Sequence, residues 1–193
     1  MEKGIQEHYQ AAMKFAGEAH AFQEVPGTKD ANYLLHVSNV AMEVLVAHAA
    51  EPTFDLALAV QMAALHDTVE DTETTIEDIS KTFGPHVAEG VAALTKNKSE
   101  SSNENVLADS LTRIKNTSGP EAAIVKLADR ITNLQEPPKD EKWDYAKTKK
   151  YQEQARVIAG ELGYAHAYLK RRIEAKIEEY TQYVLALKAQ QEN

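Results

Sequence analysis

Side chains that could do chemistry cluster in the segment AALHDTVEDT, residues 63–72. His66 and Asp67 are adjacent at the end of a strongly apolar stretch, and Glu70 and Asp71 follow four residues later. If helical geometry continues here, His66 and Glu70 share one face and Asp67 and Asp71 share another. Imidazole and carboxylate groups this close are stabilised by a nearby divalent cation. Two interpretations stand: a cation site, or polar groups that only cap the end of a helix.

Two more polar residues interrupt apolar helical patterns elsewhere in the chain. Asp129 lies among the apolar residues of IVKLADRITNL, residues 124–134, and His36 lies within LLHV. Taken singly, each has a simpler explanation than catalysis. Asp129 could form a salt bridge with Lys126 or Arg130, and a lone histidine in an apolar helix is commonly a core residue. Each residue alone is therefore a weak signal.

The elements that must position these residues are predicted to be helices, because apolar residues recur at helical spacing along most of the chain. The predicted helices cover 5–22, 35–48, 54–66, a segment beginning at Thr74 or Thr75, a segment beginning at Pro85, 121–135 and 163–190. Polar loops are predicted at 23–32 and 95–105. No internal repeat or strand pair is evident. We predict an all-α fold, a single domain over residues 1–193 with its motif-bearing core at about 5–165 and a C-terminal packing helix at about 163–190.

Composition narrows the possible functions. The chain has 43% hydrophobic and 26% charged residues, which is typical of a globular protein. It has no cysteine, so thiolate metal sites, disulfides and cysteine nucleophiles are excluded. A net charge of −9 argues against nucleic acid as a partner. No apolar run reaches the ~20 residues of a membrane span, and the first residues do not resemble a signal peptide. We expect a cytoplasmic protein that does not bind membranes, and the oligomeric state stays open.

Taken together, one ordered set of residues fits the H…HD…D pattern of the HD-domain metal-dependent phosphohydrolases: His36, His66, Asp67 and Asp129. The segments HDTVEDT, TTIEDISKTFG and VKLADRITNL closely resemble the hydrolase domain of the RelA/SpoT alarmone enzymes. The resemblance is closest to the small stand-alone members, which include the metazoan SpoT homologues, and covers residues 5–165. It implies an HD-domain helical bundle of about ten helices. It also implies metal-dependent removal of the 3′-pyrophosphate from guanosine 3′,5′-bis(diphosphate), ppGpp.

The resemblance also implies a role for each site residue. The metal ligands would be His36, His66, Asp67 and Asp129. They would hold one divalent ion, with Mn²⁺ preferred and Fe²⁺, Zn²⁺ or Mg²⁺ left open. Glu70 and Asp71 would be the catalytic pair that orients a water molecule or accepts its proton. The residues expected to bind the small nucleotide substrate are Asn133, Tyr151, Lys147, Lys29, Lys96 and Lys98.

The segment QEVPGTKDANYLLHV, residues 23–37, departs from the pattern of the family. Lys29 is its only cation, where relatives carry several, and Asn32 and Val37 stand where relatives usually have proline. In relatives an arginine of this segment stacks on the guanine base, and this sequence has no clear equivalent, so the choice of guanine is open. Alternative substrates are an adenine alarmone, NADPH at its 2′-phosphate, or a nucleoside monophosphate. Two other classes, a non-catalytic nucleotide sensor and a purely structural helical module, are disfavoured because every ligand and both acids are present.

Overall fold

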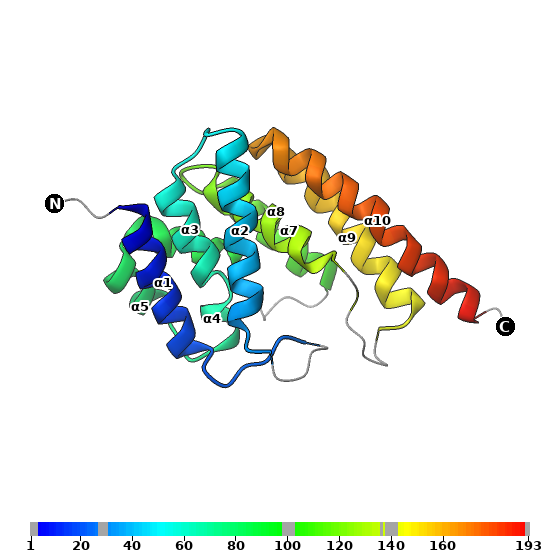
Figure 1. Ribbon diagram of the computed structural model, residues 1–193, viewed down its shortest axis with the longest axis horizontal. Coiled ribbons are helices and arrows are strands. Elements are labelled where there is room, and N and C mark those ends of the chain that lie inside the picture. Colours follow the sequence, from blue (N-terminus) through cyan, green and yellow to red (C-terminus); the bar gives the residue numbers. More distant parts are fainter. Residues whose placement is uncertain (1–3, 27–30, 98–102, 136, 138–142, 192–193) are drawn as a thin grey trace.

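A computed structural model describes residues 4–26, 31–97, 103–135, 137 and 143–191. In these residues the chain forms ten α-helices and one short 3₁₀ helix (Figure 1). The only β-type pairing among them is an isolated bridge between Glu24 and Asn32. The prediction of an all-α fold is confirmed. None of the described helices is both long enough and apolar enough to cross a membrane.

Three helices at the centre of the fold contact one another: α2 (Leu34–Ala50), α3 (Leu56–Leu65) and α8 (Glu121–Asn133). Every residue of α3 from Ala59 to Leu65 is buried, as expected for a helix that is apolar on nearly all faces. The Asp55 side chain accepts a hydrogen bond from the Leu58 N–H and caps α3. The Asp55 N–H in turn donates to the buried Glu121 carboxylate at 3.0 Å. This bond joins the start of α3 to the start of α8.

Four further helices belong to the same half of the fold as α3. Helix α1 (Ile5–Ala19) packs along it, and α4 (Thr68–Asp71) follows it after a two-residue turn. Helix α5 (Ile76–Phe83) begins at a capping box formed by Thr75 and Asp78, which decides between the two predicted start positions. Helix α6 (Pro85–Leu94) begins at its proline and contacts α3. A Cβ atom at Gly90 of α6 would collide with the end of the Met62 side chain of α3, so Met62 would have to move to admit any larger residue there.

The other half of the fold contains α7 (Asn103–Lys115), α9 (Tyr145–Leu162), the 3₁₀ helix η1 (Gly163–Ala165) and α10 (Ala167–Gln191). Helices α9 and α10 lie side by side, and α10 runs back along α9 (Figure 1). The buried residues of α10 recur at helical spacing and form one stripe along the helix: Leu169, Ile173, Ile177, Tyr180 and Val184.

Several predicted boundaries are wrong. The predicted loop at 95–105 is too long, because α7 begins at Asn103. The first helix ends at Ala19 rather than at 22, since the chain turns at His20 and the Gln23 N–H donates to the His20 carbonyl. The helix predicted to reach 135 ends at Asn133. The C-terminal helix begins at Ala167 after η1, not at 163.

Candidate active site

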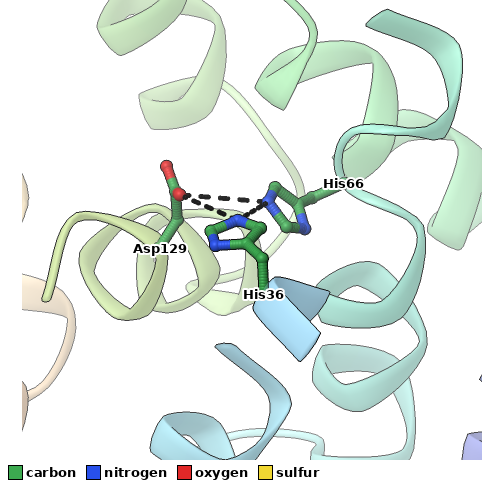
Figure 2. Close-up of side chains that lie close together, drawn as sticks. All are labelled: His36, His66 and Asp129. Carbon is green, nitrogen blue, oxygen red and sulfur yellow. Dashed lines mark hydrogen bonds and ion pairs between the residues drawn. The ribbon is translucent and has the colours of Figure 1, made fainter. Parts of the chain in front are cut away.

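His36, His66 and Asp129 meet at the centre of the fold, although they come from α2, the end of α3 and α8 (Figure 2). The two histidine Nε2 atoms lie 3.3 Å apart. Asp129 Oδ1 lies 3.6 Å from the Nε2 of His36 and 3.9 Å from the Nε2 of His66. All three side chains are buried, and their candidate ligand atoms lie within 4.8 Å of one another. Three helices thus aim nitrogen and oxygen donors at one point.

Asp67 completes the group of four predicted ligands. Its Oδ2 lies 3.0 Å from the His66 Nε2 and 3.7 Å from the His36 Nε2. The Tyr33 hydroxyl donates a hydrogen bond to the same Asp67 oxygen at 2.5 Å. The structure therefore brings together all four residues whose order along the chain suggested a metal site. We call His36, His66, Asp67 and Asp129 the central cluster.

The orientation of His66 follows from its position at the C-terminal end of α3. Its Nδ1 lies 2.8 Å from the Ala63 carbonyl oxygen. Because a carbonyl can only accept a hydrogen bond, Nδ1 carries the proton and donates it. The other ring nitrogen, Nε2, then points into the central cluster. A backbone carbonyl that fixes the tautomer and direction of a histidine is a common companion of metal-binding histidines.

The electrostatics of the central cluster couple its members. Burial alone lowers the pKa of His66, but the Asp67 carboxylate outweighs it and raises the pKa to about 9. Burial lowers the pKa of His36. Although burial raises the pKa of Asp67, the charge and hydrogen bond of His66 and the hydrogen bond from Tyr33 lower it below its ordinary range. In the absence of a cation, a proton on His66 therefore balances the Asp67 charge.

This arrangement fits a divalent cation. Two imidazole nitrogens and two carboxylates are the ligands that Mn²⁺, Fe²⁺ and Zn²⁺ accept. A cation among these donors would take the place of the His66 proton, and the Nε2 atoms of both histidines, which lie 3.3 Å apart, would then be able to bind it. The donor set does not distinguish among these ions.

Glu70 and Asp71 lie on α4, and each has a partner outside the central cluster. The Lys96 ammonium lies 2.5 Å from Glu70 Oε1, and the Lys96 backbone N–H donates to Glu70 Oε2 at 3.1 Å. Asp71 Oδ2 accepts a hydrogen bond from the Gln23 side chain at 3.0 Å. The Asp71 N–H donates to the Asp67 carbonyl, which keeps the helical register between them. The acidic pair is thus one turn beyond Asp67, as its spacing predicts.

Asp129 is held on both carboxylate oxygens. Lys126 donates to Oδ2 at 3.1 Å, and Asn133 donates to Oδ1 at 2.6 Å. Although burial raises the pKa of Asp129, the Lys126 charge helps to lower it to about 2. Of the two salt-bridge partners considered from the sequence, Lys126 is the one that contacts Asp129. Asn133 was predicted to bind substrate, and in the structure it also supports Asp129.

Sequence reasoning missed the residues that hold these side chains in place. Tyr33 supports Asp67, and Gln23 supports Asp71. The Gln23 carbonyl oxygen is itself 2.7 Å from the Nδ1 of buried His20. Since the Gln23 amide nitrogen donates to Asp71, its oxygen accepts from His20, which fixes the orientation of the whole chain of hydrogen bonds. Gln23 and Tyr33 lie within residues 23–37 and His20 lies just before them, but the sequence pattern there pointed only to His36 and Lys29 as site residues.

The five predicted substrate residues other than Asn133 separate into two groups. Lys96, Lys147 and Tyr151 line one cavity of about 280 Å³ between α7, α8 and α9, next to the central cluster. Lys147 lies over the Trp143 ring, 4.6 Å from its centroid. Lys29 and Lys98 lie outside the described residues, so their predicted roles have no structural test.

Comparison with known proteins identifies the family of this chain. A family model described as an HD domain matches residues 12–160. The chain therefore belongs to the HD-domain family. The guanosine-3′,5′-bis(diphosphate) 3′-pyrophosphohydrolase MESH1 of Danio rerio is 30% identical over 84% of this chain and 88% of that protein. MESH1 of Homo sapiens is 32% identical over an alignment that covers 77% of this chain and 82% of the human protein.

Two further comparisons extend this result. A guanosine-3′,5′-bis(diphosphate) 3′-pyrophosphohydrolase of Aquifex aeolicus is 33% identical over 66% of this chain, which spans only 17% of that longer protein. A solved structure, described as a metazoan orthologue of SpoT that hydrolyses ppGpp, superposes with a TM-score of 0.76. It covers 93% of this chain and 97% of the other, at 23% identity. This match shows that the two chains share a fold.

Proposed function

We propose that this protein hydrolyses the 3′-pyrophosphate of ppGpp-type alarmones in a metal-dependent reaction. The observation that carries the proposal is the buried central cluster with an acidic pair one turn beyond it. The names of the MESH1 relatives, which are similar to this chain over most of their length, support the choice of substrate class.

In this proposal the central cluster holds one divalent ion, with Mn²⁺ as the preferred metal. When bound, the ion supplies positive charge that stabilises the negative charge developing on the attacked phosphate group. The four side chains prepare this position through their burial and their fixed orientations. Tyr33 and Lys126 keep the two carboxylates ionised, since each donates a hydrogen bond to a carboxylate oxygen.

Glu70 and Asp71 act on the attacking water. One carboxylate accepts a proton from the water while the water oxygen bonds to the phosphorus attached to the ribose 3′ oxygen. The bond between that phosphorus and the 3′ oxygen breaks, and the oxygen takes up a proton. The balanced products are guanosine 5′-diphosphate (GDP) and pyrophosphate. Lys96 pairs with Glu70 from the segment that follows α6, so it places this acid and lies where a substrate phosphate approaches.

On the substrate side, we propose that Lys96, Lys147 and Tyr151 contact the nucleotide through the cavity that they share. Asn133 lies at the edge of the central cluster, where it can contact the ribose or a phosphate. Lys29 and Lys98 complete the proposed set of phosphate contacts. A lysine ammonium binds phosphate but does not distinguish one base from another. We therefore expect weaker discrimination between guanine and adenine than in relatives that carry the arginine.

A panel of nucleotides tests the proposal. The purified protein is incubated with Mn²⁺ and, in separate reactions, ppGpp, its adenine analogue, NADPH and a nucleoside monophosphate, and the products are separated by anion exchange. We expect pyrophosphate from the first two and little product from the others. Orthophosphate released only from the monophosphate or from NADPH would overturn the proposal. Repeating the ppGpp reaction with Fe²⁺, Zn²⁺ and Mg²⁺ tests the preference for Mn²⁺.

A further inference from the structure

The backbone N–H of Lys96 would belong to α6 if that helix continued. In an α-helix each N–H donates to the carbonyl four residues earlier, so its partner would be the Ala92 carbonyl oxygen. Instead α6 ends at Leu94, and Thr95 takes an extended conformation with φ −65° and ψ 130°. The Lys96 N–H then donates to Glu70 Oε2 at 3.1 Å. The change of backbone direction at Thr95 thus gives this N–H to the proposed catalytic acid.

Arg113 of α7 supplies the hydrogen bond that the Ala92 carbonyl would otherwise take from Lys96. Its Nη1 donates to the carbonyl oxygens of Ala92 at 2.5 Å and Ala93 at 3.0 Å. Both carbonyls lie in the last turn of α6, where a helix has acceptors without partners of its own. The partial negative charge at the C-terminal end of a helix also favours a guanidinium there. Arg113 therefore ends α6 in place of the Lys96 backbone.

The same guanidinium holds the peptide unit that joins Thr95 to Lys96. Its Nη2 donates to the Thr95 carbonyl oxygen at 2.8 Å. This carbonyl and the Lys96 N–H belong to one planar trans unit, so they point in opposite directions. Arg113 thus bonds to one side of the unit while Glu70 bonds to the other. The unit cannot rotate toward α6 without breaking the bond to Arg113.

The guanidinium is itself oriented within α7. Its Nε donates to Asp109 Oδ2 at 2.9 Å, one turn earlier on the same helix. All three nitrogens of Arg113 are therefore used, one on a carboxylate and two on backbone carbonyls. Only arginine offers several donors in a rigid planar group, whereas a lysine at this position would offer a single nitrogen.

We propose that Arg113 is a positioning residue for Glu70, which acts through the Thr95–Lys96 peptide unit. By bonding to the carbonyls of Ala92 and Thr95, it prevents α6 from extending to Lys96 and leaves the Lys96 N–H to Glu70. The inference rests on the proposed function for the role of Glu70 in turnover. Arg113 is not among the residues that line the cavity between α7, α8 and α9, so we assign it no contact with substrate.

A double-mutant cycle separates this role from a general effect on stability. Arg113→Gln should lower kcat for ppGpp about tenfold, with little change in KM, since it loses a charged hydrogen bond that orients the acid. In the Glu70→Gln background the same substitution should change kcat by less than about twofold, because the acid that it positions is gone. Equal losses in the two backgrounds would overturn the inference.

Two further variants complete the kinetic test. Arg156→Gln removes the same charge from an exposed position on α9 and should leave kcat unchanged. Arg113→Lys keeps the charge and loses the planar group, so it should show the same loss as Arg113→Gln. It also serves in its place if the glutamine variant does not fold. A wild-type rate in Arg113→Lys would overturn the inference.

The amide proton resonance of Lys96 gives a measurement that does not depend on turnover. A hydrogen bond to a carboxylate is short and strong, and it moves the resonance of the donated proton downfield. We expect this downfield shift to be lost in Glu70→Gln and in Arg113→Gln, and to be kept in Arg156→Gln. An unchanged resonance in Arg113→Gln would overturn the inference. If the wild-type protein does not cleave ppGpp, the proposed function fails, while this resonance still decides whether Arg113 directs the Lys96 N–H to Glu70.

Discussion

The Lys96 ammonium lies 2.5 Å from Glu70 Oε1, and the Lys96 backbone N–H donates to the other Glu70 oxygen. Two residues with different predicted roles, one for catalysis and one for phosphate binding, therefore contact each other. Although burial lowers the pKa of Lys96, the Glu70 charge raises it, so the lysine stays protonated. This ion pair holds Glu70, the proposed catalytic acid, in one position before substrate arrives. A phosphate that approaches Lys96 also approaches Glu70.

Replacing Glu70 with glutamine removes the proton acceptor and keeps the shape of the side chain. We expect kcat for ppGpp to fall by roughly two to four orders of magnitude, the usual contribution of general acid–base catalysis. Metal content, measured by elemental analysis, should not change, because Glu70 pairs with Lys96 outside the central cluster. Glu77→Gln on α5, which is exposed, is the matched control. A wild-type rate in Glu70→Gln would leave Asp71 as the only acid of the pair.

Replacing Tyr33 with phenylalanine removes the hydrogen bond to Asp67 and keeps the ring, which lies 5.2 Å from the His36 ring. Groups that orient metal ligands typically change metal affinity by about 10–100-fold when they are lost. We expect a decrease in this range in a competition titration of Mn²⁺ with a chelating dye. The exposed Tyr164→Phe serves as the control. Unchanged affinity in Tyr33→Phe would show that Asp67 does not need this support.

Gln23→Ala tests the support of Asp71. The change breaks the hydrogen bonds from His20 to Gln23 and from Gln23 to Asp71. We expect kcat for ppGpp to fall about tenfold, the equivalent of one charged hydrogen bond that orients the acid. Because Gln23 does not contact the central cluster in the described structure, metal affinity should stay the same. Gln10→Ala on the exposed face of α1 is the control. A rate equal to that of the control would assign Gln23 a structural role only.

Alanine substitutions at two glycines should change the free energy of unfolding in opposite directions. Gly90→Ala forces a Cβ atom into the Met62 side chain at the contact of α6 with α3. Overpacking of this kind costs about 1–3 kcal/mol in the free energy of unfolding. Gly160 lies inside α9, and a Cβ atom there meets no atom within 4 Å. Gly160→Ala should therefore stabilise the protein by about 0.5–1 kcal/mol. Urea denaturation measures both, and a stable Gly90→Ala variant would mean that Met62 can move aside.

The sequence predicts the arrangement of site residues that are close along the chain, but not the contacts between site residues that are far apart in it. The spacing of His66, Asp67 and Asp71 predicts their local arrangement, because neighbours along a helix have fixed geometry. The contact of Tyr33 with Asp67 joins residues 34 positions apart, and that of Gln23 with Asp71 joins residues 48 apart. Such pairs depend on how α1, α2 and α4 come together, which no short pattern encodes.

Helix rotation explains a second limit on sequence reasoning. Lys126 and Arg130 both lie close to Asp129 in the sequence, and both were considered as its partners. The face of α8 that turns to α2 and α3 carries Asp129, with Lys126 one turn before it. Arg130, one position further, turns instead to Tyr151 on α9. The tertiary packing of α8, rather than the spacing of charges, decides that Lys126 pairs with Asp129 while Arg130 packs against Tyr151.

The central claim is that the four side chains of the central cluster hold the metal on which ppGpp hydrolysis depends. The most direct measurement determines bound metal and ppGpp turnover together, for the wild-type protein, the chelator-treated protein and Asp129→Ala. We predict about one divalent ion per wild-type chain and one pyrophosphate per ppGpp consumed. The bound ion and the release of pyrophosphate should both be lost in Asp129→Ala and after chelation. Added Mn²⁺ should restore them only in the chelator-treated wild-type protein. Full turnover by a metal-free protein, or by Asp129→Ala, would contradict the claim.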